Sequence, residues 1–492
     1  MSLVGIDVGS SAVKAAAYDH DGHVLGVAHN ELTALHPQPG WWEQDPHEVW
    51  QATVHCMQHM ATLDAVRADP IQCIAVSASG REVFPVDENG VPLGNCLMGA
   101  DVRGSEFETL PTGATAPEPW TLACGHLRER MDPVFRVAWW RKQHPQIAAR
   151  AKWFLGWHEF LNLHIGGQTI TDHSMASRWL IYDLKTRGWS AERLAAHGMD
   201  PDQLPTIGEW GKRIGRIRPE IAAAWGLPPE VQLAVGGHDI NCMALGVGAA
   251  QDGVACLASG SYENILVPAD RLPTANMLLK GLSVMPHPGR AHLSTLAVSP
   301  TGAAVLNWAR DLLDVSIESL DAHVGANGLN PSALLAVPFL SGSMVYWEGG
   351  RKARGALIGL TLATSRADIV QAFMESVAYD HVNTFGLLAE EGVRVNKIRA
   401  AGGGTRSAWW TQLKSDMIDL PIEVVDQPEP GTLGAALLAG CALGIYADLD
   451  EASTAISKPV RCHEPNLARA TLHAEKLAQY RHTVSTLLKH IF

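Results

Sequence analysis

Two tight turns near the start of the chain constrain its fold more than any other feature. Residues 3–19 read LVGIDVGSSAVKAAAYD, with a period-two alternation on either side of a Gly-Ser-Ser triplet. Such alternation is typical of β-strands, and a small polar triplet suits a tight turn. A second turn at residues 18–22 precedes a short apolar run at residues 23–26. The pattern therefore predicts three consecutive strands joined by two turns.

The first turn carries the groups that a phosphate and a cation need. Ser10 and Ser11 offer backbone N–H groups and hydroxyls, and Lys14 adds a positive charge just beyond them. Asp7 places a carboxylate beside the turn, where magnesium could be held directly or through water. The stretch predicts a nucleotide site built on a hairpin, although an ordinary hairpin with an exposed aspartate fits it equally well. GxxxxGK[ST] and GxGxxG after a strand, the usual strand-to-helix phosphate motifs, do not occur.

Composition excludes several classes of partner. The chain has 492 residues, enough for two or three domains, with 47% hydrophobic and 18% charged residues. Its formal net charge of −13 argues against nucleic acid or an anionic membrane as the main partner. No apolar run reaches the length of a membrane span, and Asp7 and Lys14 interrupt the apolar stretch that a signal peptide would need. The eight cysteines form no CxxC pair, so we expect reduced thiols in a cytoplasmic protein.

Polar residues follow two predicted strands of the first half. Arg81 and Glu82 come after the strand at residues 72–78, and Asp239 follows a glycine turn after the strand at residues 231–234. In α/β sheets, ligand contacts gather beyond the carboxyl ends of strands. From position alone, a surface ion pair is the simpler interpretation of Arg81 and Glu82.

Two further segments of this half are assigned by their residue patterns. Residues 153–164 are predicted to form an amphipathic helix, and residues 171–177 are predicted to form a loop. No Pro/Gly/Ser-rich linker interrupts the first half, so residues 1–240 are predicted to form one α/β domain.

The second half of the chain repeats the strand-turn-strand pattern of the N-terminus. A strand at residues 254–258, the turn Ser259-Gly260-Ser261 and a strand at residues 262–267 follow one another. Two such hairpins suggest two related halves, although only a handful of residues match between them.

A triple glycine, Gly402 to Gly404, separates the strand at residues 398–401 from a helix that carries Trp409 and Trp410. Glycine lets a flat ligand or a phosphate approach the backbone closely. A tight turn alone would explain one glycine more readily than three, so the pattern favours a ligand site.

Taken in order, these segments resemble the FGGY family of carbohydrate kinases, within the actin-like ATPase group. The resemblance covers nearly the whole chain. It is carried by GIDVGSSAVKAAAYD, PGWWEQDPHEVW, MDPVFRVAWW, TDHSMAS, GGHD, ASGSYEN, GALIGLTLATSRADIVQAFME and GGGTRSAWWTQLKSD.

The resemblance implies an α/β fold with two ribonuclease-H-like domains that face a central cleft. Residues 1–240 would form the sugar- or polyol-binding domain and residues 241–492 the nucleotide-binding domain. The implied reaction transfers the γ-phosphate of ATP, with Mg²⁺, to a hydroxyl of a small sugar or polyol and leaves ADP. No role for nucleic acid or a membrane is implied, and the oligomeric state is left open, with a homodimer among the options.

Each role is carried over only onto matching positions. Asp239 would be the general base, Asp7 would position magnesium, and Arg81 and Glu82 would grip the hydroxyls of the acceptor, which replaces the surface-pair interpretation. Asn241 would bind the acceptor in place of a polar residue that often follows the aspartate. The residues expected to bind the nucleotide are Asp7, Ser10, Ser11, Lys14, Gly260, Ser261, Gly302, Gly403, Gly404 and Ser407.

Several positions depart from the family pattern. Arg136 stands where lysine is usual, and Gly99 and Asn264 replace aromatic residues that pack on the polyol in glycerol kinases. The substrate and the hydroxyl that accepts the phosphate therefore stay open. Two other classes of function remain, a catalytically weak sugar-binding regulator and a filament-forming or chaperone-like member of the actin-like group.

Overall fold

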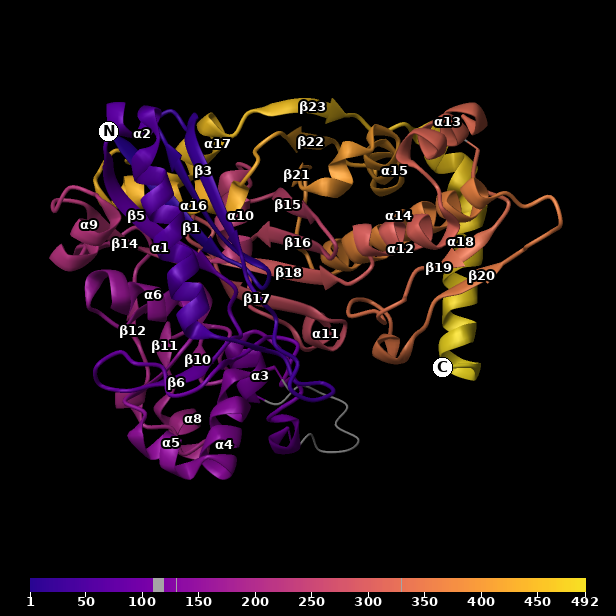
Figure 1. The fold of residues 1–492 in the computed structure, drawn as a ribbon. Coiled ribbons are helices and arrows are strands. Elements are labelled where there is room, and N and C mark those ends of the chain that lie inside the picture. Colours follow the sequence, from indigo (N-terminus) through magenta and orange to yellow (C-terminus); the bar gives the residue numbers. More distant parts are fainter. Residues whose placement is uncertain (109–118, 130, 329) are drawn as a thin grey trace. The chain divides into compact units, whose positions relative to one another are not determined.

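The structure is a computed structural model that describes residues 1–108, 119–129, 131–328 and 330–492 (Figure 1). By packing, the chain divides into two compact units. Unit 1 comprises Met1–Ala250, Val284–Leu293 and Glu429–Ser457, and unit 2 comprises Gln251–Ser283, Ser294–Pro428 and Lys458–Phe492.

Unit 1 is built on a six-stranded mixed sheet in the order β13-β14-β5-β1-β2-β3. β1 pairs antiparallel with β2, and β2 pairs antiparallel with β3, which confirms the three consecutive strands predicted from the sequence. β5 runs parallel to β1, and β14 runs parallel to β5. The described elements are β1 (Ser2–Val8), β2 (Ala12–Tyr18), β3 (Val24–Glu31), β4 (Glu43–Gln44), α1 (Pro46–Thr62), α2 (Asp64–Ala68), β5 (Ile71–Ala78), β6 (Phe84–Val86), β7 (Cys96–Leu97), η1 (Ser105–Phe107), α3 (Pro119–Cys124), α4 (Pro133–Gln143), α5 (Pro145–Arg150), β8 (Trp153–Leu155), α6 (Trp157–Gly166), β9 (Ile170–Asp172), α7 (His173–Ala176), β10 (Tyr182–Asp183), β11 (Gly188–Trp189), α8 (Ala191–Ala196), η2 (Pro201–Gln203), β12 (Thr206–Gly208), β13 (Arg213–Arg216), α9 (Pro219–Trp225), β14 (Gln232–His238), α10 (Asp239–Gly246), α16 (Pro430–Ala442) and α17 (Leu449–Ile456).

Unit 2 is built on a seven-stranded sheet in the order β17-β18-β16-β15-β21-β22-β23, although residues 284–286 of β17 are grouped with unit 1. Its hairpin β15–β16 is antiparallel, as the sequence predicted, and β21 runs parallel to β15. The described elements are β15 (Val254–Ser259), β16 (Glu263–Pro268), α11 (Ala275–Leu279), β17 (Leu282–Pro286), β18 (Leu293–Ser299), α12 (Ala303–Leu313), α13 (Ile317–Asn327), β19 (Leu335–Val337), η3 (Gly350–Lys352), β20 (Ala356–Ile358), α14 (Arg366–Glu390), β21 (Lys397–Ala401), η4 (Gly403–Arg406), α15 (Ala408–Ile418), β22 (Ile422–Val425), β23 (Pro459–His463) and α18 (Leu467–His490).

Two assignments made from the sequence are wrong. Trp153–Leu155 forms the short strand β8, paired antiparallel with β6, and the helix begins only at Trp157. A capping interaction marks that start, because the N–H of Gly156 donates to Glu159 Oε2 at 2.9 Å. Residues 171–177 are not a loop. They contain the end of β9 and the short helix α7, whose N-cap is Asp172.

The two compact units do not correspond to a single domain boundary at residue 240. α16 comes from the C-terminal part of the sequence but packs against β1, β5 and α10 of unit 1 (Figure 1). Segment 284–293 also belongs to unit 1. The structure therefore describes unit 1 as a discontinuous domain completed by two later segments.

Glycines allow α16 to pack this closely. A Cβ added to Gly5 of β1 would overlap the carbonyl oxygen of Thr432, and one added to Gly434 would overlap that of Cys242 in α10. The two backbones meet without side chains between them, so no rotamer change can make room for an added methyl group.

Replacing Gly434 with alanine should lower the free energy of unfolding by about 2–3 kcal/mol, because the new methyl group forces α16 away from α10. The matched control is Gly386→Ala in helix α14, where an added Cβ meets no atom within 4 Å. That control should be neutral or stabilise slightly through better helix propensity. Urea unfolding of both variants measures the difference, and equal stabilities would contradict the close packing.

All eight cysteines are free thiols, in agreement with the prediction. Across the described residues, no helix is long and apolar enough to cross a membrane.

Candidate functional site

Two carboxylates of unit 1 lie at the same edge of its sheet. Asp7 is near the end of β1, and Asp239 follows β14 as the first residue of α10, with β5 between these strands. The three strands are parallel, so their carboxyl ends meet at one edge. Ser77, near the end of β5, donates its hydroxyl to Asp7 Oδ1 at 2.6 Å.

Asp7 is a carboxylate that resists ionisation. Burial raises the pKa of Asp7 to about 6, and the charges of Asp239 and Glu429 act in the same direction. The hydrogen bond from Ser77 and the charge of Lys14 oppose this increase. Negative charge is therefore concentrated at this edge of the sheet, and a bound cation would relieve it.

For Asp239, the effects that favour ionisation outweigh burial. Burial raises its pKa, but His238 and the Ile240 N–H group outweigh this effect and hold the pKa of Asp239 below its usual value. His238 Nδ1 lies 2.8 Å from Asp239 Oδ1, and the Ile240 N–H donates to the same oxygen at 2.6 Å. The Asp239 side chain is 43% exposed. It is therefore an ionised carboxylate that a ligand can reach.

A hydrogen-bonded network orients the turn before Asp239. The backbone N–H of His238 donates to Ser174 Oγ at 3.0 Å, and the Ser174 hydroxyl donates to Asp172 at 2.5 Å. Gly236 is required just upstream, because a Cβ there would overlap the carbonyl of Val76 in β5. The segment TDHSMAS thus supports the aspartate through α7.

The first hairpin presents its two serines to solvent. Ser10 and Ser11 are exposed at the turn between β1 and β2. Lys14 points to the same region of unit 1 as the start of α16, where its Nζ pairs with Glu429 Oε2 at 2.8 Å. The structure thus brings Asp7, Ser10, Ser11 and Lys14 together on one hairpin, and Glu429 is a neighbour that the sequence analysis missed.

Arg81 and Glu82 are not an ordinary surface ion pair. Glu82 is buried, and Arg81 is only 12% exposed. Arg81 Nη1 lies 3.2 Å from Glu129 and 3.7 Å from Asp132, while Glu82 Oε2 accepts the N–H of Arg81 at 2.9 Å. Both residues follow β5, the strand next to those that carry the two aspartates.

Three buried residues that the sequence analysis missed surround Arg81. Burial raises the pKa of Asp132 to about 7, although Arg81 opposes the increase. Burial and the charges of Arg81 and Arg178 lower the pKa of His126 to about 3, so this imidazole is neutral. Burial and Arg81 also lower the pKa of Arg178 to about 10. The motifs MDPVF and TDHSMASR contain Asp132 and Arg178, but only their burial beside Arg81 identifies them.

Asn241 has a structural contact that the sequence did not reveal. Its side chain is buried in α10, and Nδ2 donates to the carbonyl of Pro286 at 2.9 Å. The contact ties segment 284–293 to unit 1. Binding of the acceptor by Asn241 stays a prediction.

Unit 2 brings the other predicted residues together around the β15–β16 turn. The N–H groups of Ala303 and Ala304, at the start of α12, donate to the carbonyls of Gly260 and Ser261 at 2.9 and 3.2 Å. Gly302 is needed at this junction, because a Cβ there would lie 2.7 Å from the Gly260 carbonyl oxygen. Ser261 is exposed at the turn.

The triple glycine lies against the same hairpin. Gly402 has a φ of 109°, in the region that favours glycine, and a Cβ on Gly404 would overlap the Ser259 hydroxyl. Gly403 is exposed, and an added Cβ there meets no atom within 4 Å. Ser407 caps α15, because its hydroxyl accepts the N–H of Trp410 at 3.3 Å. These glycines let backbone approach backbone beside an open surface.

A buried ion cluster lies under this hairpin. Glu263, the first residue of β16, is fully buried and pairs with Lys414 and, at 2.6 Å, with His381 Nε2. The Ser259 hydroxyl also donates to Glu263 Oε1 at 2.6 Å. Lys414 lies 3.8 Å from the centre of the Trp410 ring. The cluster links the β15–β16 turn to α14 and α15, and the segments joined are too distant in sequence for a motif to show it.

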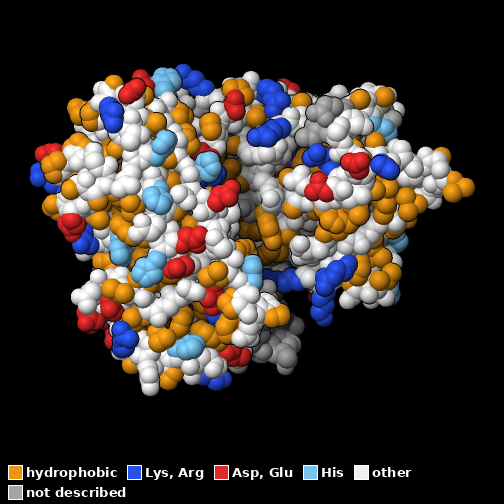
Figure 2. All heavy atoms as spheres, in the orientation of Figure 1, with side chains coloured by type: hydrophobic (Ala, Val, Ile, Leu, Met, Phe, Trp, Pro, Cys, Tyr) orange, Lys and Arg blue, Asp and Glu red, His pale blue; other side chains and the backbone are white. Residues whose placement is uncertain are grey.

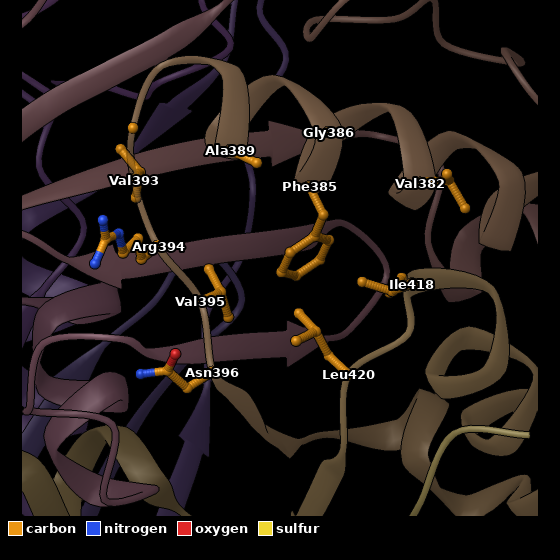
Figure 3. A pocket seen from close by; sticks show the side chains of 11 residues that line it. Val382, Phe385, Gly386, Ala389, Val393, Arg394, Val395, Asn396, Ile418 and Leu420 are labelled. Atoms are coloured by element: carbon orange, nitrogen blue, oxygen red, sulfur yellow. The ribbon is translucent and has the colours of Figure 1, made fainter.

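Two hollows contain none of the predicted residues. An apolar hollow of about 650 Å³ in unit 2 lies between the end of α14 and the chain before β21 and β22 (Figure 3). This is the amino end of those strands, opposite the triple glycine. A second hollow of about 460 Å³ lies between β3 and α1 and is lined partly by His29, His55 and His59. Figure 2 shows several histidines on the face of unit 1 that carries α1.

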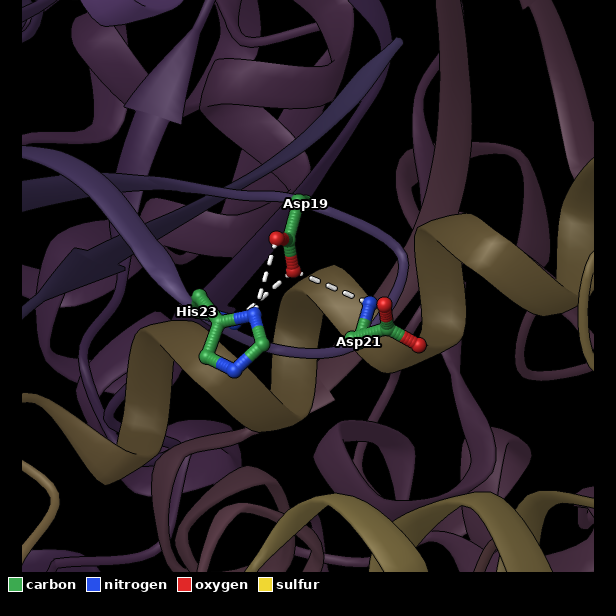
Figure 4. A group of neighbouring side chains, drawn as sticks. All are labelled: Asp19, Asp21 and His23. Carbon is green, nitrogen blue, oxygen red and sulfur yellow. Dashed lines mark hydrogen bonds and ion pairs between the residues drawn. The ribbon is translucent and has the colours of Figure 1, made fainter.

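One exposed group of potential metal ligands lies at the second turn of the chain (Figure 4). Atoms of Asp19, Asp21 and His23 lie within 4.8 Å of one another. Asp19 already accepts the backbone N–H groups of Asp21 and His23 at 2.9 and 2.8 Å. The arrangement is that of a turn stabilised by its own aspartate.

The raised pKa of Asp7 predicts a pH-dependent gain in stability for Asp7→Asn. Folding favours the protonated carboxyl, so the charged form costs stability above about pH 6 and costs little below about pH 4. In metal-free buffer, the variant should be more stable than wild type by about 1–3 kcal/mol at pH 8, and the gain should vanish towards pH 4. Thermal unfolding across this range measures it. Asp64→Asn, at an exposed helix position, should show no such trend.

Comparisons with known proteins show which family the chain is similar to in sequence and fold. Residues 2–246 match the N-terminal domain of the FGGY family of carbohydrate kinases, and residues 298–443 match its C-terminal domain. The L-xylulose/3-keto-L-gulonate kinase of Escherichia coli (strain K12) is 26% identical over 496 residues, covering 98% of this chain and 97% of that protein. The gluconokinase of Bacillus subtilis (strain 168) is 27% identical over 478 residues, covering 94% and 91%. A crystal structure of a "xyloylose kinase" from Brucella ovis superposes with a TM-score of 0.89 at 25% identity, covering 99% of both chains.

Proposed function

The chain belongs to the FGGY family of carbohydrate kinases, and on that premise we propose that it transfers the γ-phosphate of ATP to a hydroxyl of a small sugar or polyol. One observation carries the proposal. Asp239 is an ionised, accessible carboxylate at the same sheet edge as Asp7, beside the exposed serine turn of the first hairpin. Phosphoryl transfer needs such positioned charge and no covalent nucleophile.

Asp239 is the proposed general base. Its carboxylate accepts the proton of the attacking hydroxyl, and the hydroxyl oxygen forms the new bond to the γ-phosphorus as the bond to ADP breaks. In a loose transition state the proton leaves late, so a carboxylate of low pKa contributes mainly by orienting the hydroxyl. His238 and the Ile240 N–H keep the carboxylate ionised and hold its orientation.

Magnesium fits the environment of Asp7. The pKa of this carboxylate is raised by burial and by neighbouring negative charge, so the site lacks positive charge that a cation would supply. Asp7 would hold the ion, directly or through water. The ion would neutralise charge on the transferred phosphoryl group.

The remaining residues have roles in binding. In unit 1, Ser10, Ser11 and Lys14 would bind the β- and γ-phosphates, and Arg81 and Glu82 would hold the acceptor. In unit 2, the turns of the β15–β16 hairpin and of the triple glycine would hold the rest of the nucleotide, through Gly260, Ser261, Gly302, Gly403, Gly404 and Ser407.

Release of ADP by the purified protein, measured against ketoses, aldoses, polyols and sugar acids, tests the proposal. One acceptor that raises ADP release well above the acceptor-free rate, in a magnesium-dependent manner, supports it. The relatives are named for both neutral and acidic acceptors, so both classes belong in the panel. ATP binding without turnover on any member of the panel would contradict it.

A further inference from the structure

Arg178 is a buried cation without a counter-ion. Its side chain follows α7 and is 6% exposed. In the described part of the chain, Nε and Nη1 are buried and have no hydrogen-bond partner, and no carboxylate lies within ion-pair distance of this guanidinium. Burial of an unpaired charge is costly, so such a group calls for a partner.

The other buried arginines of the described chain all have partners. Arg103 pairs with Asp101 and Glu43, and Arg193 pairs with Asp183 at 3.0 Å. Arg136 donates to backbone carbonyls, including that of Gly99 at 2.9 Å. The remaining pairs are Arg399 with Glu423 at 2.9 Å and Arg469 with Asp416 at 3.1 Å. Arg178 is therefore an exception that packing does not explain.

Arg178 lies beside the groups assigned to the acceptor. A Cβ added to Gly80 would lie 2.7 Å from Arg178 Cγ and would overlap the ring of His238. The charge of Arg178 contributes to the low pKa of Asp239, and burial together with the charge of Arg81 lowers the pKa of Arg178 to about 10. The guanidinium thus adjoins both the proposed base and the proposed acceptor-binding pair.

The charges of Glu129 and Asp132 favour the charged form of Arg178, but these carboxylates leave its Nε and Nη1 without a hydrogen-bond partner. Glu129 is 3.2 Å from Arg81, and Asp132, whose pKa is about 7, is only partly ionised at neutral pH. His126 is neutral and adds no charge of its own. Asp239 already has His238 at 2.8 Å.

We propose that the acceptor is a sugar acid, and that its carboxylate binds Arg178 while one of its hydroxyls meets Asp239. This inference rests on the proposed kinase function and adds the substrate class. A guanidinium presents parallel N–H donors that match the two oxygens of a carboxylate, and the resulting hydrogen bonds are charge-assisted. A neutral polyol would leave the buried cation unpaired. Arg178 is thus a specificity-determining residue.

Matched pairs of acceptors test the inference. D-gluconate with D-glucitol, D-xylonate with xylitol and D-threonate with D-threitol differ only at the end that carries the carboxylate, and their enantiomers extend the panel. We expect kcat/KM for the preferred acid to exceed that of its alditol by at least about 100-fold, because a site built for a charged group rejects an analogue that lacks it. Calorimetric binding of the same compounds gives a readout that does not need turnover.

Substitutions of Arg178 test whether this side chain causes the preference for the acid over its alditol. Arg178→Gln should abolish most of the preference for the acid, mainly by raising KM for the acid. Arg178→Lys should restore part of this preference, because lysine restores the positive charge but not the paired N–H donors of the guanidinium. Arg67→Gln, at an exposed position of α2, is the control and should keep the wild-type preference. If Arg178→Gln does not fold, the wild-type preference for acid over alditol decides.

The outcomes separate the two proposals. Turnover of a neutral sugar or polyol at least as efficient as that of every acid would overturn the sugar-acid inference and leave the kinase proposal intact. An equal loss on acid and neutral acceptors in Arg178→Gln would also overturn it. Binding of an acid that depends on Arg178, without any ADP release, would support the inference and count against the kinase proposal. Failure of every acid to bind or react would overturn the inference.

Discussion

Replacing Asp239 with asparagine should lower kcat by about 10³-fold and leave the affinity for ATP close to that of wild type. Asparagine keeps the size of the side chain but cannot accept the proton of the attacking hydroxyl. The loss should appear in kcat more than in KM, because the interaction strengthens only as the hydroxyl reacts. Steady-state ADP release and calorimetric titration of the nucleotide measure the two quantities separately.

Asp202→Asn is the matched control for this substitution. Asp202 is exposed in η2 of the same unit, so the same chemical change there should leave kcat within about twofold of wild type. A kcat of Asp239→Asn within tenfold of wild type would show that another group takes the proton or that the hydroxyl needs no base.

Removing the carboxylate of Glu263 should lower the free energy of unfolding of unit 2 by about 3–5 kcal/mol. Glu263→Ala leaves the ammonium of Lys414 buried without its counter-ion, and it also removes the acceptor of the Ser259 hydroxyl. Because Ser259 begins the β15–β16 turn, the variant should also weaken nucleotide binding. Urea unfolding, monitored by hydrogen exchange of the backbone amides of unit 2, measures the free energy of unfolding of that unit.

Two further sets of variants test whether the loss of stability arises from burial of the ion pair. Glu263→Leu combined with Lys414→Met should recover much of the loss, because well-packed apolar side chains can replace a buried pair. Lys397→Met breaks a pair with Glu423 in which the lysine is 34% exposed, and it should cost less than about 1 kcal/mol. A similar cost for the Lys397 and Glu263 variants would contradict the importance of the buried cluster.

The Glu263 pair also predicts the sign of a pH dependence. Burial opposes ionisation, but Lys414 and His381 outweigh it and hold the pKa of Glu263 well below its usual value. The contribution of the carboxylate is therefore fully present above about pH 5 and is lost as the pH falls further. The difference between wild type and Glu263→Ala should shrink in acid.

Local sequence patterns were sufficient to predict the strands of the first two hairpins. Alternation of apolar residues predicted β1, β2 and β3. Local patterns failed at Trp153–Leu155, because three apolar residues fit a strand as well as the first turn of a helix. Pairing with β6, more than 60 residues earlier in the chain, decided for the strand.

By itself, the sequence determined the family, the two hairpins, and the positions of Asp7 near the end of one strand and of Asp239 after another, because motifs and strand ends are local in the chain. Only the tertiary structure decided which distant groups meet them. Lys14 pairs with Glu429, Glu263 pairs with Lys414, and Arg178 lies buried beside Arg81 without a counter-ion. Burial and charge pairing depend on segments that approach each other only after folding, so no local pattern encodes them.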